Sequence, residues 1–184
     1  TFMPRDQRNY NQVEASVTLE VMPKEVPAVS WSNPAPIYAG TVLSSAQLNA
    51  SANVAGTFSY TPAAGQTLPV GTHTLTATFT PQDSVRYTQA QGTVNLVVQP
   101  RLVPQVTWAT PADIVYGTTL GAAQLNASAD TAGTFVYSPA AGTIPGAGAR
   151  TLTVTFTPTD SVRYTSVEAS VNLTVEKATP QVSW

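Results

Sequence analysis

Residues 73–80 read HTLTATFT, and residues 150–157 read RTLTVTFT. In both stretches every second residue is Thr, and the first copy places Leu75, Ala77 and Phe79 between the threonines. This period-two alternation predicts a half-buried β-strand whose threonines face solvent. Thr suits the outer face because its β-branched side chain fits a pleated surface.

Both stretches belong to a longer unit that repeats with a period of 77 residues. Residues 47–98 and 124–175 align without a gap and share 33 identities in 52 positions. A third, partial copy stands at the start, where TFMPRDQRNYN (1–11) parallels TFTPQDSVRYT (78–88). Self-similarity at a fixed period indicates one structural unit used repeatedly, so we do not expect a single catalytic centre.

The remaining strands of each unit follow the same alternation. The closing strand turns Val94, Leu96 and Val98 to one face and Asn95 and Val97 to the other. Its copies and the other predicted strands carry these apolar residues: Val171, Leu173 and Val175; Val17, Leu19 and Val21; Val29 with Trp31, Val106 with Trp108 and Val182 with Trp184; Phe58 with Tyr60 and Phe135 with Tyr137. About seven short strands per unit, separated by turns, predict small antiparallel β-sandwiches.

Short proline-bearing segments separate the units. They lie at 22–27, 99–104 and 176–180 and divide the chain into 1–22, 23–100, 101–177 and 178–184. The first piece holds the last two strands of a preceding unit, and the last piece holds the first strand of a following one. Because Pro restricts φ, we expect semi-rigid joints and units stacked end to end. We expect a window from a longer array; the alternative is that both incomplete ends complete neighbouring copies by strand addition.

Composition narrows the classes of partner. Only 10% of the residues are charged and the net charge is −2, so no basic stripe is available and nucleic acid is not an expected partner. No apolar run reaches the 18 residues that suggest a membrane span in this segment. The chain has no cysteine, which excludes disulfides, thiolate catalysis and Cys-based metal sites.

Three stretches resemble bacterial immunoglobulin-like repeats: LPVGTHTLTATFTPQDSVRYTQAQGTVNLVV (68–98), GARTLTVTFTPTDSVRYTSVEASVNLTV (148–175) and IVYGTTLGAAQLNASADTAGTFVYSPAAG (114–142). The resemblance implies tandem all-β, immunoglobulin-like sandwiches of a large secreted or surface protein. It implies a non-enzymatic structural role in an extracellular stalk, fibre or surface protein. It offers no catalytic, cofactor-binding or metal-binding residues to transfer.

Two other functions remain open. One is an adhesin whose loops hold a glycan or a protein. The other is a filament subunit that assembles through its incomplete ends. In each reading the expected partners are neighbouring repeats of the same or another copy of the chain, with a glycan or protein ligand added for the adhesin.

An Asp precedes a Tyr by four residues in every copy: Asp83 and Tyr87, Asp160 and Tyr164, Asp6 and Tyr10. A calcium site is one interpretation, but Ca²⁺ takes six to eight oxygen ligands and each turn offers one carboxylate. We therefore expect each Asp to accept backbone N–H groups of its own turn. We expect each Tyr ring to fold the hairpin onto the core and each hydroxyl to reach a backbone partner.

Trp31, Trp108 and Trp184 would form a sugar-stacking platform if they were exposed. Each follows an inward-facing Val by two positions, which favours core or inter-unit packing instead.

The other chemistry-bearing residues are scattered. They are the lone His73; the carboxylates Glu14, Glu20, Glu25, Asp113, Asp130, Glu168 and Glu176; Lys24 and Lys177; and Asn49, Asn126 and Asn172 in N-x-[ST] triplets. A single His, replaced by Arg150 in the second copy, supports neither a zinc site nor a Ser-His-Asp triad. Both lysines lie in joints, which argues against an isopeptide crosslink within a core.

Overall fold

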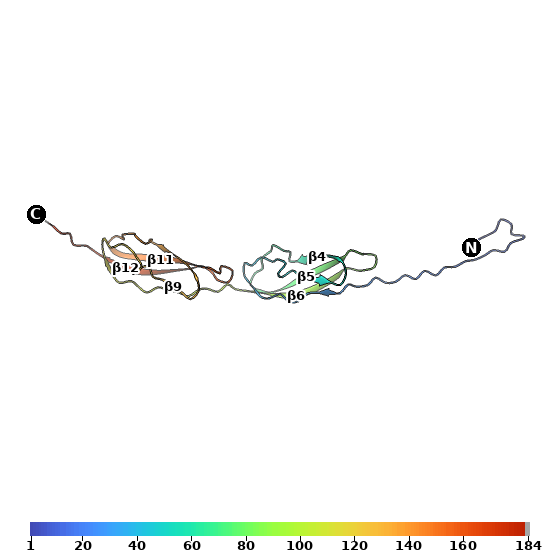
Figure 1. Ribbon diagram of the computed structural model, residues 1–184, viewed down its shortest axis with the longest axis horizontal. Helices are drawn as coiled ribbons and strands as arrows, with labels where there is room; N and C mark the ends of the chain where they lie inside the picture. Colours follow the sequence, from blue (N-terminus) through green and yellow to red (C-terminus); the bar gives the residue numbers. More distant parts are fainter. Residues whose placement is uncertain (183–184) are drawn as a thin grey trace.

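The computed structural model describes residues 1–182 and contains two β-sandwich units of the same design, one after the other (Figure 1). The first unit contains β1 (Val29–Ser30), β2 (Ile37–Tyr38), β3 (Ser51–Ala52), β4 (Gly56–Thr61), β5 (Gly71–Pro81) and β6 (Ala90–Gln99). The second contains β7 (Val106–Thr107), β8 (Ile114–Val115), β9 (Ser128–Ala129), β10 (Gly133–Ser138), β11 (Gly148–Pro158) and β12 (Val167–Glu176). The predicted tandem of all-β sandwiches is confirmed.

Each unit contains a four-stranded sheet and a two-stranded sheet. The larger sheets have the orders β2-β6-β5-β4 and β10-β11-β12-β8, and the smaller ones pair β1 with β3 and β7 with β9. All pairs are antiparallel except β2 with β6 and β8 with β12, which run parallel. These parallel pairs join an early strand of each unit to its last strand.

The alternation of the long strands forms the core. In β5, Leu75 and Phe79 are at most 1% exposed, and in β11 the equivalent Leu152 and Phe156 are fully buried. The buried side chains that pack together as a core are Ile37, Leu43, Leu48, Leu75, Val94, Leu96 and Val98 in the first unit and Ile114, Leu120, Leu152, Leu173 and Val175 in the second. Burying one such side chain stabilises a fold by about 1.5–3 kcal/mol. Each unit therefore has an apolar core of its own.

Trp31 closes the side of the first core. Its ring packs edge-on against Tyr60 with centroids 5.5 Å apart, and its Nε1 donates a hydrogen bond to the Gln47 carbonyl oxygen at 3.1 Å. Trp108 repeats this arrangement, with 5.4 Å to the Tyr137 ring and 3.0 Å to the Gln124 oxygen. The prediction that these tryptophans pack against cores is confirmed for both. Trp184 lies outside the described residues.

Two expectations about strands were wrong. Within residues 1–182 each unit has six strands, not about seven, and the first strand of each is only two residues long and ends before its Trp. In addition, Val17, Leu19 and Val21 form no strand, and Val182 lies outside any strand and is exposed. A strand persists only where a neighbouring strand pairs with it and covers its apolar face, and within residues 1–182 no strand pairs with 14–22 or 177–182.

Candidate functional site: the joint between the units

The C-terminal end of the first unit, its trailing end, remains hydrogen-bonded to that unit up to the joint. The Ala39 amide donates to the Gln99 carbonyl oxygen at 2.8 Å, which extends the parallel β2–β6 pair by one residue. Two residues later, Arg101 Nε donates to the Ala39 carbonyl oxygen at 3.0 Å. The guanidinium covers Gly40, where an added Cβ would lie 2.6 Å from Arg101 Nη2. Gly40 also has a φ of 88°, which favours glycine.

The N-terminal end of the second unit, its leading end, is hydrogen-bonded to that unit from Leu102 onward. The Leu102 amide donates to the Arg163 carbonyl oxygen at 2.9 Å, and the Thr165 amide donates to the Leu102 carbonyl oxygen at 2.9 Å. The Gln105 amide then donates to the Asp130 carboxylate at 3.0 Å. These hydrogen bonds fix the chain to the second unit before β7 begins.

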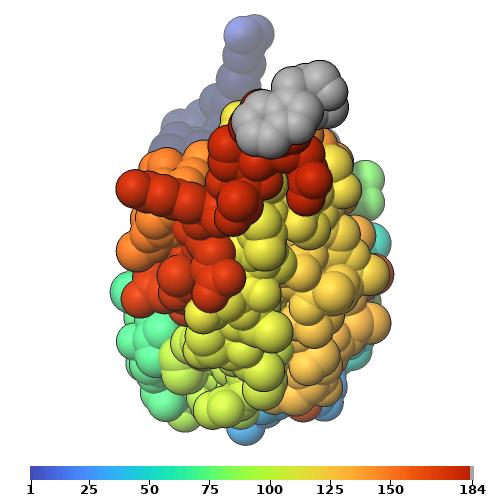
Figure 2. All heavy atoms as spheres, turned by 90° about the vertical axis from the view of Figure 1, so that its left-hand side faces the viewer, coloured from blue at the N-terminus to red at the C-terminus, as the bar shows by residue number. Residues whose placement is uncertain are grey.

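Only Pro100 and Arg101 lie between the last residue paired in the first unit and the first paired in the second. Proline fixes the φ angle of one of them, and the hydrogen bond to Ala39 holds the side chain of the other. Seen along the long axis, the second unit hides most of the first (Figure 2). The joint therefore stacks the units end to end with almost no free chain between them.

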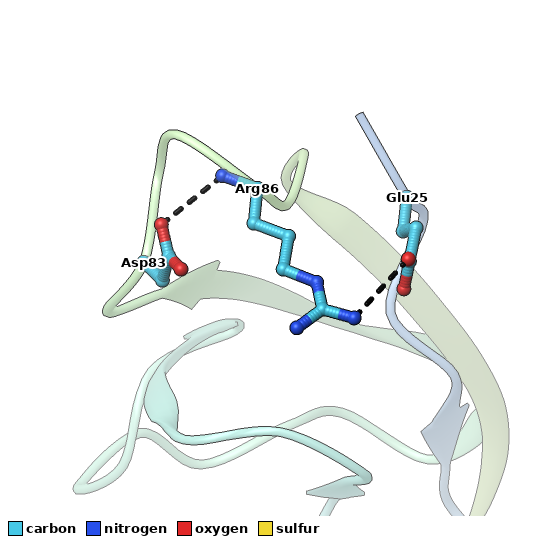
Figure 3. A network of polar contacts seen from close by, with 3 residues as sticks. All are labelled: Glu25, Asp83 and Arg86. Atoms are coloured by element: carbon cyan, nitrogen blue, oxygen red, sulfur yellow. Dashed lines mark hydrogen bonds and ion pairs between the residues drawn. The ribbon is translucent and has the colours of Figure 1, made fainter. Parts of the chain in front are cut away.

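The same leading-end geometry recurs in the first unit, next to the Asp83 turn. The Glu25 amide donates to the Arg86 carbonyl oxygen at 2.9 Å, and Arg86 Nη2 lies 3.5 Å from Glu25 Oε1 (Figure 3). Both side chains of this ion pair are about 60% exposed, so its contribution to stability is small. Lys24 Nζ adds a hydrogen bond to the Ser84 carbonyl oxygen at 2.6 Å.

Asp83 organises its own turn, as predicted. Its Oδ1 accepts hydrogen bonds from the amides of Val85 at 3.1 Å and Arg86 at 3.0 Å. The Tyr87 amide donates to the Asp83 carbonyl oxygen at 3.1 Å, and Tyr164 and Tyr10 repeat this bond at the same length. Among residues 1–182, no group of three or more His, Cys, Asp or Glu side chains is placed to hold a metal ion.

The other Asp turns use the same bonds. Asp160 accepts a hydrogen bond from the Arg163 amide at 3.0 Å. Asp6 accepts from the Asn9 amide at 3.2 Å and from Asn9 Nδ2 at 2.8 Å. The side-chain hydrogen bond from Asn9 is the main reason why the pKa of the Asp6 carboxyl lies below its ordinary value.

The expected role of the Tyr87 and Tyr164 hydroxyls was wrong. Within the described part of the chain neither hydroxyl has a hydrogen-bond partner, and instead the neighbouring Arg86 and Arg163 lie over the two rings at 5.4 and 5.6 Å. Two other tyrosines, both part-buried, have hydroxyls with a backbone partner: Tyr60 accepts from the Ala50 amide at 3.1 Å, and Tyr137 accepts from the Ala127 amide at 3.0 Å. The Asp turns lie at the exposed leading ends, where water can satisfy a hydroxyl.

The remaining candidates stay apart from one another. His73 Nε2 contacts the Pro69 carbonyl oxygen at 2.8 Å near the start of β5. Asn49 and Asn126 donate within their own turns, Asn172 accepts from Thr151 across the sheet, and Lys177 is exposed. Sequence reasoning missed Arg101; the signal was a single arginine inside a proline-bearing joint, two residues after the closing strand.

No family model and no curated protein matches the chain. Among solved structures, it is similar to the fibronectin(III)-like modules of Clostridium thermocellum CbhA, with 15% identity, a TM-score of 0.32, and coverage of 82% of this chain and 95% of that one. It is also similar to human protocadherin-24 EC1-2, with 12% identity, a TM-score of 0.31, and coverage of 81% and 98%. Both similarities are distant, and the strand pairing described above shows two tandem all-β sandwiches of one design.

The described residues 1–182 include no helix that could span a membrane.

Proposed function

We propose that this chain is a non-enzymatic spacer segment of a longer extracellular protein, a stalk, fibre or surface protein. Each unit supplies a fixed length and each joint supplies a fixed angle. The observation that carries the proposal is the joint, where two residues separate Gln99 from Leu102 and both have restricted freedom. The resemblance of the repeats to those of bacterial surface proteins supports the extracellular setting.

The pairing of the chain ends suits a segment under tension. In the first unit the leading residue Glu25 forms a parallel bridge with Tyr87, and β2 runs parallel to β6. Pulling on the two ends draws the early strand toward the N-terminus and the late strand toward the C-terminus. Parallel neighbours pulled in opposite directions are sheared, so their hydrogen bonds bear load together instead of opening one at a time.

The outer face of the larger sheet is polar and carries little charge, which suits a spacer that does not bind other molecules. Thr78 accepts from Gln91 at 3.3 Å, and Thr74 donates to Asn95 at 3.2 Å. Side chains of this kind satisfy one another and water without carrying charge. A polar surface that carries little charge avoids strong electrostatic attraction to other molecules.

The adhesin alternative stays a prediction with less support. The tryptophans that would stack on a sugar, Trp31 and Trp108, are partly buried, and each uses its indole N–H within its own unit. A glycan array probed with the chain tests this alternative, and specific binding would favour it over the spacer.

Small-angle X-ray scattering tests the spacer proposal. The chain is compared with a variant that carries Gly-Ser-Gly-Ser inserted between Pro100 and Arg101. We expect the scattering of the parent to fit one extended arrangement of the units, and the variant to require a broad ensemble, because Gly/Ser linkers behave as flexible coils. A parent that requires an equally broad ensemble would contradict the proposal.

A further inference from the structure

In each unit an early strand and the last strand meet along one line of parallel pairing, which we call the seam. In the first unit β2 pairs with Val98 and Gln99 of β6, and the Ala39 amide adds a hydrogen bond to the Gln99 carbonyl oxygen at 2.8 Å. In the second unit β8 pairs with β12 in the same way, and the Tyr116 amide donates to the Glu176 carbonyl oxygen at 2.8 Å. The backbone part of the seam is therefore the same in both units.

Two side chains extend the seam of the first unit. Ahead of β2, Asn33 Oδ1 accepts a hydrogen bond from the Asn95 amide at 3.1 Å. Behind β2, Arg101 Nε donates to the Ala39 carbonyl oxygen at 3.0 Å. Each bond joins the early segment to the late segment across 62 positions of the chain. The seam of the first unit thus runs from 33 to 39 on one side and from 95 to 101 on the other.

The second unit lacks both of these side chains. Thr110 stands where the first unit has Asn33, and Ala178 stands where it has Arg101. Threonine carries its oxygen one bond closer to the backbone than asparagine does, and the alanine side chain has no donor. Within the described residues 1–182, no side-chain hydrogen bond joins 109–117 to 172–178; the Asn172 side chain accepts from Thr151 of β11 instead. The seam of the second unit is held by its backbone alone.

The leading ends do not offset this difference. Glu25 forms a parallel bridge with Tyr87, and Leu102 forms one with Tyr164. The backbone hydrogen bonds of both bridges measure 2.9 Å. Only the first unit adds the exposed side-chain contacts of Lys24 and Glu25 described above. Every contact that differs between the two units along this line therefore favours the first.

Tension on the chain ends acts on the two seams in series. The chain enters each unit at one end and leaves it at the other (Figure 1), so the early strand and the last strand are pulled in opposite directions. Hydrogen bonds along a sheared seam break together, and each additional bond that must break before opening slows the opening. We propose that the two units open in a fixed order under tension, the second before the first, and that Asn33 and Arg101 set this order.

The order gives the chain a graded response to load. An opened unit extends by up to about 3.3–3.6 Å per residue, so the second unit supplies extra length while the first stays folded. That the chain bears load at all rests on the proposed spacer function, whereas the order of opening is a property of the chain itself.

Constant-force spectroscopy on the whole chain, held by its two ends in optical tweezers, measures the lifetime of each unit. A short Gly/Ser insertion between the exposed residues Ala63 and Ala64 lengthens the step of the first unit and so identifies it. The matched insertion between Ala140 and Ala141 marks the second unit in a separate sample. In both samples we expect the second unit to open first, with a lifetime about ten- to a hundredfold shorter than that of the first.

Variants of the two side chains test the cause. Asn33→Ala and Arg101→Ala should each shorten the lifetime of the first unit about three- to tenfold and leave that of the second unchanged. Asn33→Asp is the control, since a carboxylate oxygen can still accept from the Asn95 amide. The reciprocal graft gives the second unit the side chains of the first. It combines Thr110→Asn and Ala178→Arg with Tyr116→Ala, and it should lengthen the lifetime of the second unit.

Opening in random order, or of the first unit before the second, would overturn the proposal. A first-unit lifetime that neither Asn33→Ala nor Arg101→Ala changes would do the same. If these variants fail to fold by circular dichroism, the graft decides, and an unchanged lifetime of the second unit would then refute the role of the two side chains. A broad scattering ensemble of the parent contradicts the spacer function and leaves the order of opening intact, so the two failures are distinguishable.

Discussion

At the trailing end of the first unit, Arg101 folds back onto Ala39. At the trailing end of the second, Tyr116 takes the place of Ala39, and an open hollow of about 310 Å³ lies between Tyr116, Ala147 and Lys177. The cores differ far less, since Leu75 and Phe79 are matched by Leu152 and Phe156 at equal burial. The repeat therefore keeps its interior constant and varies the trailing ends of its units.

The strongest test of the shared interior is removal of its largest buried ring. Phe79→Ala in the first unit and Phe156→Ala in the second should each destabilise their own unit by about 3–5 kcal/mol. Residue-resolved hydrogen exchange in urea measures both units in one sample. The unit that is not mutated should change by less than about 0.5 kcal/mol; a matching loss there would mean that the two cores fold as one.

Substitutions of the two tryptophans test whether equivalent contacts contribute equally to the stability of the two units. Trp31→Phe and Trp108→Phe keep a ring against the core and remove the hydrogen bond to Gln47 or Gln124. Each change should cost about 1–2 kcal/mol, because a carbonyl oxygen loses its donor and the smaller ring leaves a gap. Thermal unfolding followed by circular dichroism gives the values, and an effect confined to one unit would break the equivalence.

The Asp turns should contribute less. Asp83→Ala and Asp160→Ala each remove a carboxylate that accepts turn amides at the exposed leading end. A loss of about 0.5–1.5 kcal/mol is expected from exposed bonds of this kind. Asp83→Asn and Asp160→Asn are the controls, since the amide oxygen can still accept. Calcium titration by calorimetry should give no heat with the parent chain; saturable heat that Asp83→Ala abolishes would contradict a purely structural turn.

The smallest effect on stability concerns a packing difference between the closing strands β6 and β12, where Gly92 corresponds to Ala169. Ala169→Gly should destabilise the second unit by about 0.5–1 kcal/mol, because glycine weakens a strand. Gly92→Ala should stabilise the first unit by less than Ala169→Gly destabilises the second. The reason is that the added Cβ would lie only 2.9 Å from the Val29 Cγ1 methyl. Val29→Ala combined with Gly92→Ala serves as the control for this contact. Urea titrations of the four chains measure the differences, and a full gain in Gly92→Ala alone would show that the contact imposes no constraint.

The long strands could be predicted from the sequence because their apolar and polar residues alternate, over 73–80 in one strand and over 94–98 in the next. Leu75, Phe79 and Leu96 were assigned to the core for that reason, and the Asp83 turn followed from its Asp and Pro. The two-residue strands β1, β2 and β3 are too short to carry a period, so their number was overestimated. The parallel pairing of β2 with β6 is a contact between distant residues, which local patterns do not encode.

Local sequence patterns also could not predict the joint, because its contacts join residues that are far apart in the chain. The hydrogen bond from Arg101 to Ala39 joins residues 62 positions apart, and its geometry depends on where β2 ends. The hairpin at 1–22 carries the sequence of a strand, yet Val17, Leu19 and Val21 form none. A repeated pattern predicts what a segment can become; the neighbouring strands decide whether it does.

The distance distribution between the two units reports how rigidly the joint holds them. Because the chain has no cysteine, spin labels can be attached at Thr78→Cys and Thr155→Cys on the outer faces of β5 and β11. Pulsed dipolar spectroscopy should give one narrow distribution for the parent, and a broader one for Arg101→Ala, in which the hydrogen bond to Ala39 is lost. A parent distribution as broad as that of a chain with a flexible Gly/Ser joint would show that the joint does not hold the two units at a fixed angle.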